Sequence, residues 1–188
     1  PIDIHCYEGV NQLEREAYKG GRVELFYKGY PGEAEYYKLD INSMYPYVMK
    51  VNTFPVKFQK FYLNPSVGYL VNRLKRYACI AHVNVTVDKP AISTKIEGRN
   101  IYPIGTFDTY LTTPELQWVI DNGSINQVYQ LATYSQDYIF SSFVEEMYKI
   151  RMEAYSQDNQ VFYLIAKLIM NSLYGKFGQL NSEFKYFG

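Results

Sequence analysis

The sequence predicts an α+β fold with antiparallel strands and a C-terminal pair of helices. Residues 78–87 are rich in β-branched side chains, including Val83, Val85 and Val87, as in a strand. Apolar residues recur at helical spacing in 141–156 and again in 159–174. Segments rich in glycine and proline, such as 28–32, separate the periodic stretches, as turns do. The chain therefore combines strands and helices.

Length and composition limit the possible functions. A chain of 188 residues is one domain, or one domain with an insertion, and its hydrophobic share of 47% suffices for a core. The formal net charge is zero, which argues against non-specific DNA binding by bulk charge but leaves a local basic site open. The 21 tyrosines suit half-buried surfaces and stacking platforms.

Cysteine usage and hydropathy exclude further classes. Cys6 and Cys79 lack CxxC spacing and are too few for a zinc site, so a reducing, cytoplasmic compartment is expected. No apolar run approaches the roughly 20 residues of a membrane span, and no signal peptide is visible. Because the ends at Pro1 and Gly188 do not look natural, we expect a piece of a longer protein.

The first third of the chain predicts a hairpin and a short helix. Residues 22–27 and 35–41 both read as strands, joined by the turn at 28–32. Residues 43–50 read as a short helix or turn that ends before Pro55 and directs Met44, Tyr47, Val48 and Met49 inward. Residues 56–76 show little pattern.

The rest of the chain predicts alternating elements and a helix pair. The strand at 78–87 is followed by a loop-rich region over 89–109. A helix begins at Thr113, as a hydroxyl cap, and continues to about Asp121, and a strand covers 125–131. Two helices follow over 141–156 and 159–174, and Gly175 and Gly178 close the second. Its core side is expected to be formed by Val161, Phe162, Leu164, Ile165, Leu168, Ile169 and Leu173.

The last helix carries an unusual polar set. Lys167, Asn171 and Tyr174 stand at i, i+4 and i+7, so they share one helical face. A cation, an amide and a phenol in this order suit a phosphate, a sugar edge and a flat base. Antiparallel packing of the two helices would bring Arg151 to the same surface as Lys167. For any lysine taken alone, a solvated helix face is an equally good explanation.

A second polar segment lies far upstream. Asp40 stands at the predicted strand's end, where its carboxylate could hold a divalent metal ion. Tyr45 could lay its ring against a sugar and exclude a 2′-hydroxyl. The alternative is an aspartate that caps the following helix.

These segments together match known motifs. Asp40-Ile-Asn-Ser43-Met-Tyr45-Pro46 resembles the DxxSLYP motif A of family B DNA polymerases, with Met44 where leucine is usual. The stretch from Lys167 to Gly175 matches their KxxxNSxYG motif B, and Tyr18-Lys-Gly20-Gly21 resembles their YxGG joint. The chain is most similar to the protein-primed branch found in phages and linear plasmids.

The resemblance implies a role for each matching residue. Asp40 would bind catalytic metal, with two Mg²⁺ ions expected in the full-length enzyme, and Tyr45 would discriminate the sugar. Lys167 would be a catalytic contact to the incoming deoxynucleoside triphosphate (dNTP), helped by Arg151. The residues next to the nascent pair would be Asn171 and Tyr174. The residues that handle DNA would be Tyr18, Gly20, Gly21, Ser43 and Gly175.

The same resemblance implies the architecture and the partners. Residues 1–56 would hold the YxGG joint and the N-terminal palm, 57–138 an insertion that contacts terminal protein and DNA, and 139–188 a helical-hairpin fingers element. The partners would be DNA template-primer, dNTP and terminal protein, without a membrane, in the cytoplasm of a host cell.

One departure from the family is evident. A YxDTD motif C, which carries the second metal-binding carboxylate, is missing from the sequence. We therefore expect this segment to be inactive alone. The alternatives are a non-catalytic module that binds nucleic acid or terminal protein, a degenerate polymerase relic, and a tyrosine-rich fold with coincidental motifs.

Overall fold

The computed structural model describes residues 4–177 and contains two compact units. One unit groups residues 1–22 with 54–137, and the other groups 23–53 with 138–188. The chain thus passes from the first unit to the second, back to the first, and again to the second. Within the described residues, none of the helices has the length and apolar character that crossing a bilayer requires.

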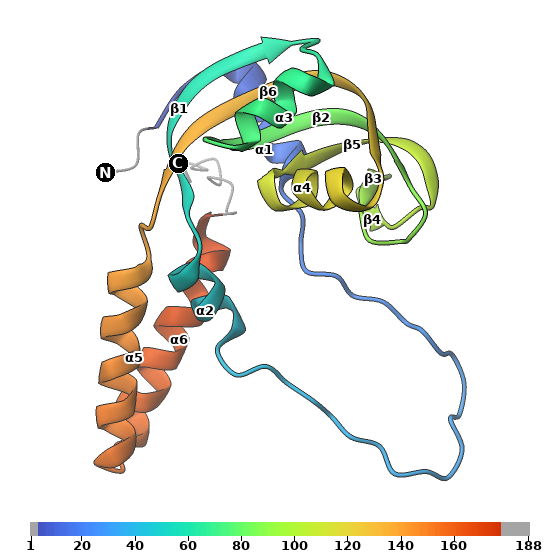
Figure 1. Cartoon of the computed structure of the whole chain (residues 1–188). Coiled ribbons are helices and arrows are strands. Elements are labelled where there is room, and N and C mark those ends of the chain that lie inside the picture. Colours follow the sequence, from blue (N-terminus) through green and yellow to red (C-terminus); the bar gives the residue numbers. More distant parts are fainter. Residues whose placement is uncertain (1–3, 178–188) are drawn as a thin grey trace, which may run out of the picture. The chain divides into compact units, whose positions relative to one another are not determined.

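The first unit is built on a four-stranded antiparallel sheet (Figure 1). In spatial order its strands are β1 (Phe54–Leu63), β6 (Ser124–Asp137), β2 (Ala78–Val87) and β5 (Gly105–Thr112). The long strand β6 pairs with both β1 and β2, so it joins the two halves of the sheet. A separate two-stranded hairpin comprises β3 (Thr94–Ile96) and β4 (Arg99–Ile101).

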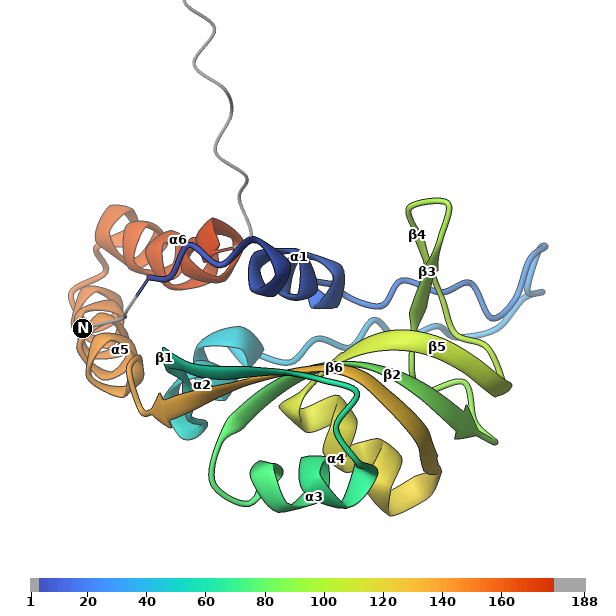
Figure 2. The same ribbon diagram turned by 90° about the horizontal axis from the view of Figure 1, so that it is seen from above.

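Helices cover both faces of this sheet (Figure 2). On one face, α3 (Val67–Leu74) and α4 (Thr113–Asn122) pack on alternate residues of β2, and Leu70, Leu111 and Leu116 are fully buried there. Each such leucine contributes about 1.5–3 kcal/mol through burial. On the other face, α1 (Glu8–Ala17) packs through Val10 and Leu13. Along β2, the alternate residues from Cys79 to Val87 are buried on the α3 and α4 face, whereas Ala78 and the partly buried Ile80 belong to the α1 face.

The helix α4 begins with a complete capping box. The side chain of Glu115 accepts hydrogen bonds from the backbone N–H of Thr112 (2.8 Å) and from its hydroxyl (2.9 Å). Pro114 occupies the first turn, where its missing N–H costs nothing. The sequence correctly predicts this helix start, but the cap is Thr112 and not Thr113.

Among its described residues, the second unit contains three helices. They are α2 (Met44–Val51), α5 (Ser141–Ser156) and α6 (Gln160–Phe177). The consecutive helices α5 and α6 form a hairpin, and α2 packs against both (Figure 1). The connection turns at Asp158, whose φ of 52° is left-handed, and the Asn159 side chain then accepts a hydrogen bond from Phe162 N (3.2 Å). This bond caps α6, as an asparagine at that position is expected to do.

Several elements confirm the sequence predictions, and others were missed. The strand at 78–87 and the helix at 141–156 occur with the predicted bounds. The predictions missed α1, β1, α3 and β5, which occupy regions without a clear local pattern.

The predicted hairpin over residues 22–41 is wrong. Residues 18–43 contain no helix or strand, and apolar side chains in this stretch are exposed, including Val23 (95%) and Leu39 (90%). The alternating pattern is real, but an isolated hairpin is only marginally stable without a third strand or a helix to cover its apolar face. No such cover is available to it within residues 4–177.

The predicted core side of the last helix is also wrong. Leu168 is 69% exposed and Phe162 is 57% exposed, whereas Ala166 and Met170 are buried. A two-helix hairpin buries only one narrow stripe of each partner, and the small Ala166 fits that close contact. In the same way, α2 buries Met49 but leaves three residues predicted to point inward exposed, namely Met44, Tyr47 and Val48.

The predicted closing glycines do not end this helix within the described residues. Gly175 lies inside α6, which continues to Phe177, and Gly178 lies outside the described residues.

Candidate functional site

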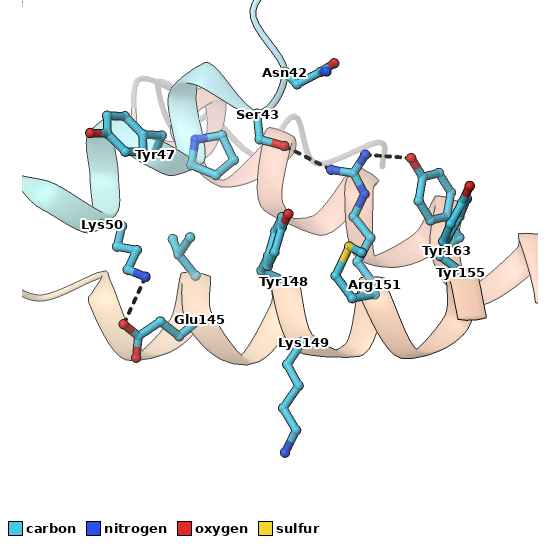
Figure 3. A pocket seen from close by; sticks show the side chains of 13 residues that line it. Asn42, Ser43, Tyr47, Lys50, Glu145, Tyr148, Lys149, Arg151, Tyr155 and Tyr163 are labelled. Atoms are coloured by element: carbon cyan, nitrogen blue, oxygen red, sulfur yellow. Dashed lines mark hydrogen bonds and ion pairs between the residues drawn. The ribbon is translucent and has the colours of Figure 1, made fainter. Parts of the chain in front are cut away.

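A single guanidinium connects the three helical segments of the second unit. Arg151 on α5 donates from Nη1 to the Ser43 hydroxyl oxygen (2.9 Å) and from Nη2 to the Tyr163 hydroxyl oxygen on α6 (2.6 Å) (Figure 3). Its Cζ atom also lies 4.7 Å from the centroid of the Tyr163 ring. Ser43 adopts a left-handed backbone (φ 55°) directly before α2. Arg151 therefore fixes the turn after Asp40 against the α5–α6 hairpin.

These residues line a pocket of about 640 Å³. The pocket lies along α2 and α5, and its wall is strongly aromatic (Figure 3). The tyrosines that line it are Tyr47, Tyr148, Tyr155 and Tyr163. A pocket of this size with flat aromatic walls suits a small organic ligand, and Arg151 gives it an anion-binding group.

A second set of contacts holds the far end of this pocket. Lys50 on α2 forms an ion pair with Glu145 on α5 (3.1 Å), and the Ser141 hydroxyl donates to the Lys50 carbonyl oxygen (2.6 Å). The Lys50 charge is therefore neutralised within the protein. Lys149 points away from Arg151 (Figure 3). Among these three cations, Arg151 is thus the one best placed for an external anion.

Electrostatics place Lys167 near the same residues. The pKa of Tyr163 is lowered, chiefly by the hydrogen bond from Arg151, while burial acts in the opposite direction. The positive charges of Arg151 and Lys167 lower that pKa further. Lys167 is exposed and follows Tyr163 by one helical turn. Arg151 and Lys167 thus both act on this phenol, and the expectation that they share one surface stays a prediction.

The comparison with known proteins identifies the family. The sequence model described as "DNA polymerase type B, organellar and viral" matches residues 5–187. The match extends over nearly the whole chain and includes all three motif segments. The chain belongs to this family.

Relatives in other genomes agree with this assignment. A protein named "Probable DNA polymerase" from Neurospora intermedia is 29% identical over 189 residues, covering 93% of this chain and 18% of the relative. The "DNA polymerase" of the Acidianus bottle-shaped virus is 28% identical over 199 residues, covering 97% of this chain and 30% of the relative. The chain thus spans less than a third of the length of either protein.

A solved structure shows the same fold. Phi29 DNA polymerase matches with a TM-score of 0.68 at 20% sequence identity, over 93% of this chain and 32% of that one. The α+β class with an antiparallel sheet is therefore confirmed, and the fold is that of a portion of a type B polymerase.

Only part of motif A lines the pocket. Ser43 and Asn42 line the pocket, whereas Asp40 and Tyr45 do not. Asp40 is exposed on the extended stretch before α2, and Tyr45 is 44% exposed in the first turn of that helix.

The residues that the structure describes do not complete a metal site. Carboxylate oxygen is the donor type that Mg²⁺ prefers, so Asp40 fits as one ligand. However, residues 4–177 contain no cluster of three or more histidine, cysteine, aspartate or glutamate side chains suited to a metal ion. A pair of ions requires more carboxylates than Asp40 alone.

The motif B residues all lie on α6. Asn171 is exposed there with Lys167, and Gly175 leaves open space where a Cβ would stand. The backbone of Tyr174 continues the same helix, and its side chain lies outside what the structure describes.

The YxGG joint belongs to the other unit. Tyr18 caps the C-terminus of α1, where its N–H donates to the Glu14 carbonyl oxygen (3.0 Å), and its side chain is 43% exposed. Gly20 and Gly21 follow in an extended stretch without helix or strand.

Sequence reasoning missed Tyr163. It lies four residues before Lys167, so the same helical spacing that selects Asn171 and Tyr174 would have placed it beside the lysine. Its contact with Arg151 could not be found in this way, because it depends on how α5 and α6 pack.

Proposed function

We propose that this chain is the nucleotide-binding part of a DNA-directed DNA polymerase that adds dNTPs to a 3′-hydroxyl during protein-primed replication. Membership in the type B family across residues 5–187 carries this proposal, because the match contains motifs A and B in the family's order. The contact of Ser43 in motif A with Arg151 supports it, since this contact links motif A to the hairpin that bears motif B.

The proposed substrate follows from the charges and ring faces of the second unit. A dNTP carries a strongly anionic triphosphate, a sugar and a flat base. A guanidinium has five N–H donors. Arg151 uses one on Nη1 for Ser43 and one on Nη2 for Tyr163, so its other N–H groups are available to phosphate oxygens. Lys167 adds a mobile point charge. Together these cations would neutralise the charge that develops on the leaving pyrophosphate.

The remaining roles are assigned by motif position. Tyr45 would pack against the sugar and exclude ribose, and Asn171 and Tyr174 would lie next to the nascent base pair. Ser43, Gly175 and the joint residues Tyr18, Gly20 and Gly21 would handle DNA. The functional division into 1–56, 57–138 and 139–188 is proposed on the same basis, with the middle part contacting terminal protein and DNA.

Mg²⁺ is the proposed cofactor, and it would neutralise the triphosphate when bound. Asp40 would supply one carboxylate ligand. Since the described residues supply no complete set, we propose that further ligands come from outside them and that the segment alone is inactive. The intact enzyme would act in the cytoplasm of the host cell.

The test is substitution of Asp40 in the full-length polymerase. We expect Asp40→Ala to abolish primer extension, because a metal ligand would be lost. Glu35→Ala, which removes another exposed carboxylate from the same extended segment, should leave extension unchanged. An Asp40→Ala enzyme that keeps most of its activity would contradict the proposal.

A non-catalytic module remains the second candidate, favoured by the incomplete carboxylate set of the described residues. It predicts that Asp40→Ala and Glu35→Ala behave alike and that DNA is still bound without extension.

A further inference from the structure

The YxGG joint is anchored to the first unit by the lysine between its tyrosine and its first glycine. Lys19 Nζ donates to the Glu115 carboxylate (3.1 Å) and to the Ser93 carbonyl oxygen (3.0 Å). The Lys19 side chain is only 10% exposed, which is unusual for a lysine. These contacts span 96 and 74 residues of sequence, so they tie the joint to distant parts of the unit.

Both partners of Lys19 are themselves held rigidly. One oxygen of Glu115 binds Lys19, and the other accepts the two capping bonds from Thr112 at the start of α4. Ser93 is 4% exposed, and its carbonyl oxygen also accepts a hydrogen bond from the buried Thr109 hydroxyl (2.7 Å). Lys19 is therefore bound to the N-terminal turn of α4 and to a carbonyl oxygen just before β3, which is itself hydrogen-bonded to Thr109 on β5.

A second anchor lies just beyond the glycines. Arg22 Nη1 donates to the Pro90 carbonyl oxygen (2.9 Å), and its Cζ atom lies 4.2 Å from the centroid of the Tyr102 ring. Gly20 and Gly21 are thus flanked on both sides by cations that reach back to the unit. The glycine stretch is held at its two ends.

The glycine itself is not explained by the fold. A Cβ built on Gly20 would meet no heavy atom within 4 Å, and its φ does not lie in the left-handed region. Within the described residues, neither packing nor backbone conformation requires glycine there. Because glycine has no side chain, an external partner can approach its backbone closely. The partner that fits the role proposed for this joint is a strand of DNA.

The buried pair is a poor explanation for stability alone. Desolvation lowers the pKa of Lys19 even though Glu115 acts in the opposite direction. Replacing a buried ion pair with apolar side chains is often neutral or stabilising, and such pairs can instead fix one geometry. The geometry fixed here is that of the joint.

We propose that Lys19 and Glu115 are positioning residues that hold the YxGG joint on the unit formed by 1–22 and 54–137, so that the Gly20–Gly21 backbone is presented to the template strand. This inference rests on the proposed polymerase function. In this arrangement, Lys19 favours DNA binding indirectly, because it fixes the backbone of the joint. Glu115 also favours DNA binding, although its negative charge by itself would repel DNA.

The sign of the Glu115 effect provides the test. In the full-length polymerase, Glu115→Gln removes a negative charge but keeps a side chain that can complete the capping box, so α4 should still form. If the pair positions the joint, Glu115→Gln and Lys19→Met should both raise the Kd for template-primer, by about fivefold, at unchanged KM for dNTP. If Lys19 instead acts only as a positive charge near DNA, Glu115→Gln should tighten binding, and the inference is wrong.

Two controls separate the explanations. Lys28→Met removes an exposed cation from the extended stretch that follows the joint and reports the effect of bulk charge, which we expect to be below twofold. A lower unfolding midpoint and kcat with unchanged template-primer Kd would mean a purely structural role and would also overturn the inference. If Asp40→Ala is inactive while both joint variants bind DNA normally, this inference alone fails. If Asp40→Ala remains active, the proposed function fails instead.

Discussion

Replacing Arg151 with lysine separates its charge from its geometry. The guanidinium donates to Ser43 at 2.9 Å and to Tyr163 at 2.6 Å, from two different nitrogens. A lysine keeps the positive charge but lacks the planar fork that reaches both hydroxyl oxygens from two separate nitrogens, so we expect it to keep one of the two bonds and lose the other. If Arg151 meets the triphosphate as proposed, its side chain will be less well oriented in the Arg151→Lys enzyme.

The expected magnitude follows from that lost bond. A hydrogen bond from a charged donor is worth about 1.5–3 kcal/mol when buried, and partial exposure here reduces the value to about 1 kcal/mol. A loss of that size corresponds to about a fivefold higher KM for dNTP, with kcat nearly unchanged. Arg151→Ala, which loses both bonds and the charge, should raise KM by roughly tenfold or more.

The assay is steady-state insertion of a single nucleotide by the full-length polymerase. Lys149→Met is the charge control, because it removes a cation from the same helix that points away from Arg151 (Figure 3). We expect its KM to change less than twofold. If Arg151→Lys has the KM of the wild type, the forked contact is irrelevant to nucleotide binding. If Arg151→Ala also has the KM of the wild type, Arg151 has no role in nucleotide binding.

Two further predictions concern the first unit. A Cβ at Gly123 would lie 2.6 Å from the Thr86 carbonyl oxygen on β2, whereas one at Gly68 would meet nothing within 4 Å. Gly123→Ala should therefore lower the free energy of unfolding by about 1–3 kcal/mol, and Gly68→Ala, inside α3, should raise it by up to about 1 kcal/mol. Denaturant titration measures both, and equal effects would refute the reasoning. Burial raises the pKa of the Cys79 thiol from 9.0 to about 12. Between these pH values the folded state keeps the thiol proton, whereas the unfolded state loses it. The contribution of the buried Cys79 thiol to the free energy of unfolding is therefore complete below about pH 9 and disappears as the pH rises to about 12. In the native protein at pH 8, a thiol reagent should label the exposed Cys6 quickly and Cys79 only after unfolding. Equal labelling rates would show that Cys79 is accessible.

Local sequence patterns correctly predicted those helices and strands whose apolar face is covered by other elements in the fold. The strand 78–87 has the predicted bounds because α3 and α4 cover its apolar face, and the helix 141–156 because α2 and α6 pack against it. The same reasoning failed over residues 22–41, where the alternation is present but the described residues provide no strand or helix to cover it. It failed again on α6, where Leu168 belongs to an apolar face that α5 does not reach.

The sequence by itself determined the family and the order of its motifs, because Asp40, Lys167 and the joint residues are recognised by type and spacing within short segments. Only the tertiary structure decided what those residues touch. Arg151 meets Ser43 across 108 residues, and Lys19 meets Glu115 across 96. No local period encodes such pairs, because they arise only when separate elements pack and bring distant side chains within hydrogen-bond distance.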